Sequence, residues 1–271
     1  MAQQRSDACT SGADYERYMG RWSRLVARDF VTWLDRALGL RWLDVGCGTG
    51  SLSAVVAEQC GPRWVVGCDR SEAFVRTAAR RGRTSSAATR FVVADALALP
   101  VPEGAFDVAV SGLTLNFLPE PAIAVRELAR GVRPGGLVAA YVWDYGDGMD
   151  LLRHFWTAAT ATDPAAAALD ETRRFGDCRP EPLHSLWTGA GLTDVTTAPL
   201  EVPTVFADFT DLWDPFRSGQ GPAPGYVASL TPAARDRLRE ALRATIPTAP
   251  DGSVPLTARA WAVRGVRAVR P

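Results

Sequence analysis

A glycine-rich turn followed by spaced acidic residues is the feature of this sequence with the clearest chemistry. Glycine occupies every second position of Gly46-Cys47-Gly48-Thr49-Gly50, and a backbone without side chains lets a ligand approach closely. Asp69 ends the next apolar run, and its carboxylate can accept hydrogen bonds from both hydroxyls of a ribose. Asp95 ends a third run, where it could meet an adenine amino group. The pattern therefore indicates a site for an adenosine-containing ligand.

The spacing separates this turn from two other glycine-rich motifs. The dinucleotide fingerprint would place its third glycine at position 51, where Ser51 stands. A phosphate-binding loop would end in Gly-Lys-Ser or Gly-Lys-Thr, and this turn does not. An NAD(P)-dependent oxidoreductase stays open as an alternative, because a doubly wound sheet with a glycine turn and Asp69 also suits an adenosine dinucleotide.

The elements that must position these residues alternate between strand and helix. Strands are expected at 41–45, 64–68, 91–93, 106–110 and 137–143. Helices are expected at 15–38, 51–59, 72–81 and 119–131. This alternation predicts parallel pairing in an open sheet that is covered on both faces. Ligands of such sheets bind at the carboxyl ends of the strands, which is where the glycine turn falls.

The second half of the chain has a less regular pattern. Helices are expected at 149–169 (interrupted at Pro164), 182–190, 208–216 and 232–244. A Gly/Pro segment stands at 218–225, and strands are expected at 192–197 and 256–266.

The ordered set of motifs resembles the class I S-adenosylmethionine-dependent methyltransferases. The set comprises Leu43 to Gly50, Asp69, Asp95, Phe106-Asp107-Val108 and Arg133-Pro134-Gly135-Gly136. Three more segments resemble a bacterial subgroup of these enzymes: Tyr18 to Ser23, Gly219 to Pro222 and Ala258 to Trp261. The resemblance implies an α/β fold, a doubly wound, seven-stranded and mostly parallel sheet with a helical cap after the fifth strand. It also implies S-adenosylmethionine as cofactor and methyl transfer to a small-molecule acceptor.

The expected organisation is one methyltransferase domain over residues 1–271. Its parts are an N-terminal helical lid (1–38), a cofactor-binding core (39–145), an acceptor cap with the remaining sheet elements (146–255) and a closing strand (256–271).

The resemblance also implies which residues bind the cofactor. Arg21 could pair with the methionyl carboxylate, because a guanidinium fork suits a planar carboxylate. Ser111 is expected near the cofactor. The complete predicted set is Arg21, Asp44, Gly46, Cys47, Gly48, Gly50, Asp69, Arg70, Asp95, Ala96 and Ser111.

Acceptor binding and catalysis are expected after the fourth and fifth strands. Methyl transfer needs alignment of the nucleophile with the methyl group, and a base only when the nucleophile arrives protonated. The predicted acceptor-binding residues are Asn116, Phe117, Trp143 and Tyr145, and the predicted catalytic residues are His154 as base and Asp144. Capping and packing explain residues 143–145 equally well, and His154 could instead be a packed core residue. His184 is interpreted as structural.

Composition narrows the class of protein. The formal net charge is zero, which argues against general binding to nucleic acid or to a membrane surface. Arg76, Arg80, Arg81 and Arg83 are interpreted as a solvated helix face. Five cysteines without a Cys-x-x-Cys pair indicate reduced thiols, and two histidines exclude a His-rich metal site, so no metal is expected.

The polar N-terminus and the absence of a long apolar run predict a soluble cytoplasmic protein, as monomer or homodimer. A second alternative is a methyltransferase-like protein that binds the cofactor without transferring a methyl group. A third is methylation of a macromolecule, for which no Asn-Pro-Pro-Tyr-like motif follows the fourth strand.

Overall fold

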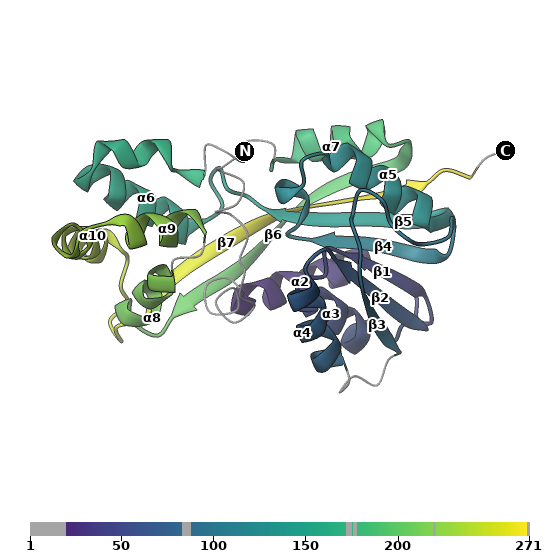
Figure 1. The fold of residues 1–271 in the computed structure, drawn as a ribbon, viewed down its shortest axis with the longest axis horizontal. Coiled ribbons are helices and arrows are strands. Elements are labelled where there is room, and N and C mark those ends of the chain that lie inside the picture. Colours follow the sequence, from purple (N-terminus) through teal and green to yellow (C-terminus); the bar gives the residue numbers. More distant parts are fainter. Residues whose placement is uncertain (1–19, 83–87, 172–174, 176–177, 219–220, 270–271) are drawn as a thin grey trace. The chain divides into compact units, whose positions relative to one another are not determined.

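Seven strands form one sheet in the order β3-β2-β1-β4-β5-β7-β6 (Figure 1). The computed structural model describes residues 20–82, 88–171, 175, 178–218 and 221–269. The strands are β1 (Arg41–Val45), β2 (Trp64–Asp69), β3 (Thr89–Val93), β4 (Phe106–Gly112), β5 (Val132–Trp143), β6 (Leu192–Phe206) and β7 (Val254–Arg267). The first five pair in parallel, and β7 pairs with β5 antiparallel. This confirms the predicted seven-stranded, mostly parallel sheet.

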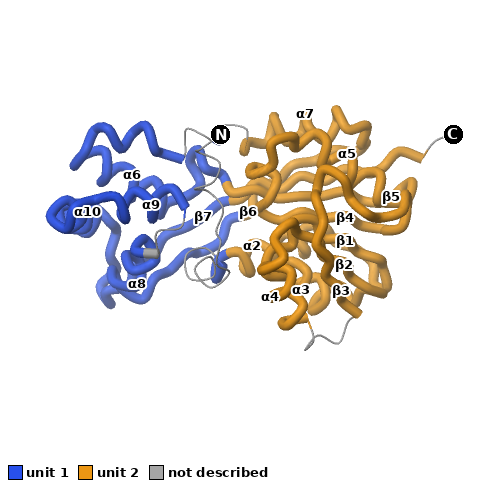
Figure 2. Tube along the Cα trace, viewed as in Figure 1, with its two compact units in different colours: residues 1–22, 144–176, 201–259 blue, residues 23–143, 177–200, 260–271 orange. Residues whose placement is uncertain are grey.

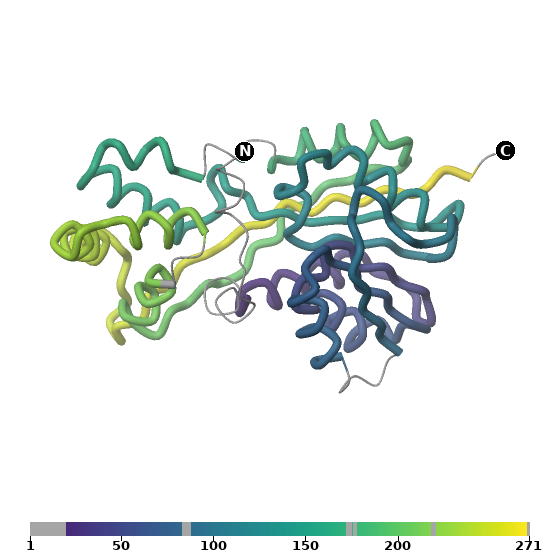
Figure 3. Tube along the Cα trace, viewed as in Figure 1, coloured from purple at the N-terminus to yellow at the C-terminus, as the bar shows by residue number. Residues whose placement is uncertain are grey.

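The strand order reverses beside β1. The chain moves outward from β1 to β2 and β3, and then returns to place β4 on the other side of β1. The last strand, β7, lies between β5 and β6 (Figure 3). In an open α/β sheet, the carboxyl ends of the two strands at such a reversal leave a crevice between the flanking loops. In this sheet the two strands at the reversal are β1 and β4.

Helices cover both faces of the sheet (Figure 1). One face carries α2 (Arg21–Leu34), α3 (Ser51–Gln59) and α4 (Glu72–Gly82), and the other carries α5 (Pro121–Gly131) and α7 (Pro180–Gly189). The central strands are therefore buried on both sides, as the unbroken burial of residues 137–143 in β5 illustrates.

An ion-pair cluster ties the start of β4 to β1. Arg41 donates from Nε and Nη2 to the Asp107 carboxylate at 2.9 and 3.1 Å, and its backbone amide donates at 2.9 Å. Arg133 Nε donates to the same carboxylate at 2.7 Å. These hydrogen bonds, chiefly that from Arg41, hold the pKa of Asp107 well below its ordinary value. The Phe106-Asp107-Val108 motif thus has a structural role.

The chain divides into two compact units (Figure 2). Unit 2 comprises residues 23–143, 177–200 and 260–271, and contains the parallel strands. Unit 1 comprises residues 1–22, 144–176 and 201–259. Its helices are α6 (Asp150–Thr162), α8 (Phe209–Trp213), α9 (Pro222–Ser229) and α10 (Pro232–Thr245), with short 3-10 turns at Pro164–Ala168 and Asp214–Ser218. Unit 1 includes most of the predicted cap, whereas residues 177–200 belong to unit 2. The organisation as one methyltransferase domain over residues 1–271 stays a prediction.

Several element boundaries differ from those expected. Strand β6 runs to Phe206 rather than position 197, because an edge strand tolerates Pro199 and Pro203. Helix α9 begins within the predicted Gly/Pro segment and continues to Ser229, because its prolines include one in the first helical turn. Helix α2 begins at Arg21, and the earlier part of the predicted helix, residues 15–19, lies outside the described residues.

Candidate functional site

The glycine turn follows β1, at the reversal in strand order. The backbone amides of Gly46 and Cys47 both donate to the carbonyl of Cys68, at 2.8 and 2.9 Å. Gly46 has φ +73°, and a Cβ there would lie 2.3 Å from the Thr114 side chain, so only glycine fits. At Gly48 (φ +53°) an added Cβ would meet no described atom within 4 Å. The turn is therefore packed at Gly46 and open at Gly48.

Asp69 connects the end of β2 to this turn. Its Oδ2 accepts from the Gly48 amide at 3.0 Å, and its Oδ1 accepts from the Ser71 amide at 2.8 Å. The carboxylate is thereby fixed in orientation, and each oxygen keeps a further lone pair. Such a carboxylate can accept from two neighbouring hydroxyl groups.

Asp44 is a buried acid with one unused oxygen. It lies in β1 with 1% of its surface exposed, and Ser53 Oγ donates to its Oδ2 at 2.6 Å. Among the described residues, Oδ1 has no hydrogen-bond partner. Burial raises the pKa of Asp44 to about 7, against the opposing effect of Ser53. A buried acceptor without a partner is uncommon in folded proteins and suits a donor or cation supplied by a ligand.

The other predicted adenosine contacts follow β2 and β3. Asp95 is exposed, and its Oδ1 accepts from the Leu97 amide at 2.9 Å. The Ala94 amide donates to the Asp69 carbonyl at 3.1 Å, which brings this segment beside the end of β2. Val93 is 52% exposed and offers an apolar surface there, while Arg70 is exposed and Ala96 half-buried.

Ser111 and Thr114 attach the segment after β4 to the glycine turn. The buried Ser111 Oγ donates to the Val45 carbonyl at 2.8 Å, and Thr114 Oγ1 donates to the Gly46 carbonyl at 3.0 Å. Sequence reasoning missed Thr114, because its role depends on a contact with a residue 68 positions away.

The predicted acceptor residues after β4 lie in a short 3-10 helix, Leu115–Phe117. The Nδ2 and Oδ1 atoms of Asn116 are both buried, and neither has a hydrogen-bond partner among the described residues. Phe117 is 50% exposed. An amide with unused donors and acceptors beside an exposed aromatic ring can recognise a ligand that is partly polar and partly planar.

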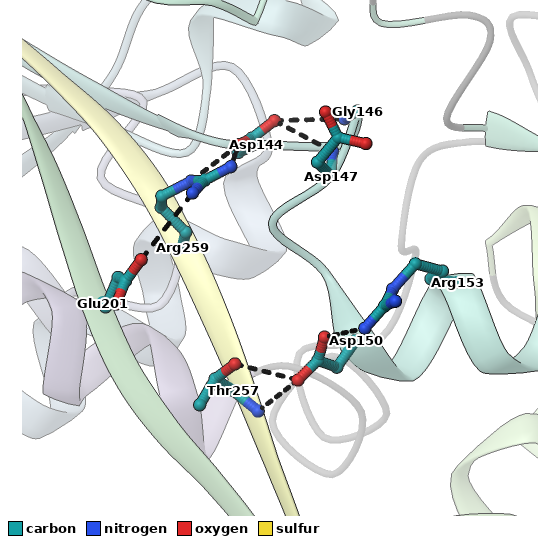
Figure 4. A network of polar contacts seen from close by, with 8 residues as sticks. All are labelled: Asp144, Gly146, Asp147, Asp150, Arg153, Glu201, Thr257 and Arg259. Carbon is teal, nitrogen blue, oxygen red and sulfur yellow. Dashed lines mark hydrogen bonds and ion pairs between the residues drawn. The ribbon is translucent and has the colours of Figure 1, made fainter.

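The residues after β5 form a network in unit 1 (Figure 4). Arg259 donates from Nε and Nη2 to Asp144 Oδ2 at 2.8 and 2.6 Å, and the Gly146 and Asp147 amides donate to Oδ1 at 3.2 and 3.3 Å. Arg259 also lies 3.7 Å from Glu201. Asp144 is 3% exposed, so its carboxylate mainly holds the turn after β5 against β7.

A second pair of contacts in the same network fixes the start of α6. Asp150 Oδ2 accepts from the amide and hydroxyl of Thr257 at 2.9 and 2.8 Å, and Asp150 Oδ1 pairs with Arg153 (Figure 4). Arg259 belongs to the family-like segment Ala258 to Trp261, and no local pattern indicates its partner Asp144, which lies 115 positions away.

Trp143 and Tyr145 flank Asp144 in the chain and are both buried, Trp143 in unit 2 and Tyr145 in unit 1. The Tyr145 ring packs on Phe175 with a centroid distance of 4.5 Å.

His154 lies in α6 and is half-buried. Burial lowers its pKa from the ordinary value, and the neighbouring Arg153 charge adds to this. The imidazole is therefore neutral at pH 7, the form that accepts a proton. A pocket of about 380 Å³ opens beside α6 and is lined by Gly146, Arg153, Trp156, Thr157, Thr160, Ala161 and Asp170. His154 is not one of these lining residues. His184 is exposed on α7.

Arg21, at the start of α2, belongs to unit 1. Its Nη1 donates to both carboxylate oxygens of Asp211 at 3.0 Å, and its guanidinium stacks on the Trp22 and Phe206 rings at 4.5 and 4.6 Å. Asp211 was not foreseen, because it lies 190 positions away.

The predicted residues thus fall into two sets. Unit 2 brings together the glycine turn, Asp44, Asp69, Asp95 and the segment from Ser111 to Phe117. Unit 1 contains Arg21, Asp144, Tyr145 and His154. Within the described residues there is no cluster of three or more His, Cys, Asp or Glu side chains suited to a metal ion.

Comparison with known proteins identifies the core. Residues 43–140 match the family model described as a methyltransferase domain. The chain is similar to a 2-methyl-6-phytyl-1,4-hydroquinone methyltransferase of Synechocystis, with 31% identity over 185 residues that cover 68% of this chain and 56% of the relative. It is also similar to a 2-phytyl-1,4-naphtoquinone methyltransferase of Synechococcus elongatus, with 36% identity over 119 residues, or 43% of this chain and 51% of the relative.

A solved structure shares the fold. It is phosphoethanolamine N-methyltransferase 2 of Haemonchus contortus, in complex with phosphomonomethylethanolamine and S-adenosylhomocysteine. The TM-score is 0.59 at 16% identity, and the match covers 96% of this chain and 57% of that one. The chain spans about half the length of the curated relatives it matches.

Residues 43–140 are therefore a class I S-adenosylmethionine-dependent methyltransferase domain, which confirms the resemblance seen in the sequence. None of the three proteins described above is an oxidoreductase.

Proposed function

We propose that this protein transfers a methyl group from S-adenosylmethionine to a small-molecule acceptor. The observation that carries the proposal is the position of Asp69: its carboxylate is held by the Gly48 amide at the end of β2, beside a turn that is open at Gly48. The methyltransferase domain match over residues 43–140 supports the reaction type.

The donors and acceptors of the site fit this cofactor. Asp69 would accept from the ribose hydroxyls, and Asp95 with Ala96 and Arg70 would surround the adenine. The turn Gly46-Cys47-Gly48 with Gly50, together with Ser111, would lie along the amino-acid part. The unused Oδ1 of Asp44 suits the positive charge that the cofactor carries. Arg21 would pair with the methionyl carboxylate.

Once bound, S-adenosylmethionine supplies an activated methyl group on a sulfonium, so the protein mainly aligns the acceptor and excludes water. Asn116 and Phe117, with Trp143 and Tyr145, would orient the acceptor. His154 would accept a proton from an acceptor that arrives protonated, because its lowered pKa keeps the imidazole neutral. Asp144 would act indirectly, by holding the turn after β5.

Aromatic hydroxy compounds are the first acceptors to test. Two relatives are named as methyltransferases of a phytyl hydroquinone and a phytyl naphthoquinone. A phenolic hydroxyl would also suit a neutral histidine as base, which is the role proposed for His154.

The test is transfer of label from methyl-labelled S-adenosylmethionine to hydroquinones, and to a metabolite extract of the source cells. A labelled small-molecule product with an equal amount of S-adenosylhomocysteine, both lost in Asp69→Ala, is the expected result. Cofactor binding without any labelled product would instead favour the alternative of a binding protein without transfer activity.

Cytoplasmic location and a monomeric or dimeric state complete the proposal. Among the described residues, no helix combines the length and the apolar character needed to cross a bilayer. Cys47, Cys60 and Cys68 are buried free thiols, which suits a reducing compartment.

A further inference from the structure

Thr114 connects two segments of unit 2 that lie far apart in the sequence. Its Oγ1 donates to the carbonyl oxygens of Gly46 and Gly112, both at 3.0 Å, so that its one proton is shared between them. Gly46 belongs to the turn after β1, whereas Gly112 ends β4. A single hydroxyl group therefore ties together the ends of the two strands at which the strand order reverses.

The contact with the glycine turn is close as well as polar. A Cβ added to Gly46 would lie 2.3 Å from Cγ2 and 2.4 Å from Oγ1 of Thr114, so the Thr114 side chain fills the space beside Gly46. Ser111 makes a second tether, since its Oγ donates to the Val45 carbonyl at 2.8 Å. Ser111 lies inside β4 and anchors the strand. Thr114 lies beyond the end of β4 and anchors the segment that follows.

The chain reaches Thr114 through a strained residue. Leu113 has φ +56°, a left-handed conformation that is uncommon for residues with a side chain. The Leu113 amide donates to the carbonyl of Tyr141 in β5 at 2.8 Å, which fixes the backbone just before Thr114. Strained residues persist where the surrounding contacts over-determine them, and they concentrate at functional sites. The position of Thr114 is therefore imposed by contacts with β5 and the glycine turn rather than by local preference.

The short 3-10 helix Leu115–Phe117 begins on Thr114. The Phe117 amide donates to the Thr114 carbonyl at 3.0 Å, which closes this helical turn. Within the turn, both polar atoms of the Asn116 side chain are buried and have no hydrogen-bond partner among the described residues. A displacement of Thr114 would therefore move Asn116 and Phe117 with it.

We propose that Thr114 is a positioning residue: its hydroxyl holds the segment Leu115–Phe117 in register with the glycine turn, so that a cofactor bound at the turn also orders this segment. The inference rests on the proposed function, which puts the cofactor at the glycine turn and the acceptor at Asn116 and Phe117. Alignment of these two molecules is the main task of the protein in methyl transfer, because a misplacement of about 1 Å can cost on the order of 100-fold in rate.

The first arm of the test measures hydrogen exchange of the Phe117 amide by NMR in the ligand-free protein, because this amide reports whether the 3-10 helix is closed. Thr114→Val keeps the shape of the side chain and removes the hydroxyl, so the amide should exchange about 3- to 10-fold faster. Thr114→Ser retains the hydroxyl and should exchange as the wild-type protein does. Thr188→Val is the matched control, because Thr188 is exposed on α7 and its hydroxyl also donates to a backbone carbonyl, that of His184 at 2.9 Å.

The second arm adds S-adenosylhomocysteine. In the wild-type protein, S-adenosylhomocysteine should slow the exchange of the Phe117 amide further. In Thr114→Val this response should be lost, although calorimetry still shows binding, and in Thr114→Ser it should be kept. A role of Thr114 in packing alone would not produce this ligand-dependent difference. Thr114→Ala, which brings no methyl group close to the two carbonyls, replaces Thr114→Val if that variant does not fold.

The inference is overturned if the Phe117 amide exchanges at the wild-type rate in folded Thr114→Val. It is also overturned if S-adenosylhomocysteine binds the wild-type protein without slowing this exchange, or slows it equally in Thr114→Val. Loss of S-adenosylhomocysteine binding in folded Thr114→Val would overturn it too, because Thr114 would then build the cofactor turn rather than place the segment after it. Failure of the proposed function looks different: the wild-type protein would not bind S-adenosylhomocysteine, while exchange of the Phe117 amide in the ligand-free protein would still depend on the Thr114 hydroxyl.

Discussion

The Gly48 backbone amide donates a 3.0 Å hydrogen bond to Asp69 Oδ2, and this bond joins the turn after β1 to the acid that ends β2. Two motifs that are 21 positions apart in the chain thereby become one site. The Gly48 amide orients the carboxylate, and the carboxylate in turn holds the turn in shape.

Removing the Asp69 carboxylate should weaken cofactor binding. We expect Asp69→Ala to lower the affinity for S-adenosylhomocysteine about 10- to 100-fold, because hydrogen bonds to a charged group are lost. Asp236→Asn, at an exposed position of α10, should bind as the wild-type protein does. Calorimetry on both variants checks this, and unchanged affinity in Asp69→Ala would remove Asp69 from the site.

Asp44 should make stability fall as pH rises. Its pKa is raised to about 7 in the folded protein by burial, so the folded state favours the protonated acid and binds more protons than the unfolded state between about pH 4 and 7. Relative to Asp44→Asn, the wild-type free energy of unfolding should therefore drop by about 1.4 kcal/mol per pH unit across that window. Denaturant titrations at pH 5 and pH 8 measure the change, and a pH-independent difference would contradict it.

Asp107 should stabilise the fold with the opposite pH dependence to that of Asp44. Its pKa is lowered, mainly by Arg41, so its contribution is present above the ordinary carboxyl pKa of about 4 and lost as the pH falls below it. Asp107→Asn should cost about 1–3 kcal/mol at pH 7, and the difference should shrink towards pH 2. Because Arg41 and Arg133 are partly solvent-exposed, we expect the loss of stability to lie near the lower end of this range. Equal stability at pH 7 would rule out this role.

The pair of the buried Asp144 and the half-buried Arg259 predicts strong coupling. Arg259→Gln leaves the buried Asp144 carboxylate without its cation and should destabilise the protein by up to about 3 kcal/mol, less than for a fully buried pair because Arg259 is 29% exposed. Asp144→Asn combined with Arg259→Gln should recover much of this loss, because no charge is then left unpaired. A thermodynamic cycle of the two single variants and the double variant measures the coupling. Additive effects would mean that the pair contributes little.

His154 can be separated from a packing role by kinetics. If it is the base, His154→Ala should lower kcat about 100-fold or more and leave S-adenosylhomocysteine affinity unchanged. The matched control is His184→Ala, since His184 is exposed on α7 in the other unit. Wild-type turnover in His154→Ala would assign His154 to packing.

Much of the sheet could be predicted because its strands leave a strong local signal. Strand β1 and helix α3 have the expected bounds, since buried parallel strands read as short apolar runs and the glycine turn marks the junction between them. Strand β6 and helix α9 were missed in part, because proline weakens the local sequence pattern in both. The edge position of β6 accommodates its prolines, and α9 has a proline in its first turn, where a helix tolerates it.

The site was predictable only where function depends on local spacing. The glycine turn and Asp69 follow directly from the motif. The pairs Asp144–Arg259 and Arg21–Asp211 join residues 115 and 190 positions apart, and no local pattern links them. Their roles come from tertiary packing alone.

Calorimetric titration of the purified protein with S-adenosylhomocysteine, beside NAD⁺ and NADP⁺, tests most directly which cofactor the glycine turn binds. We expect the protein to bind S-adenosylhomocysteine and neither nicotinamide cofactor, with the affinity for S-adenosylhomocysteine reduced in Asp69→Ala. Binding of NAD⁺ or NADP⁺ without S-adenosylhomocysteine would contradict it, and would make the glycine turn a dinucleotide site.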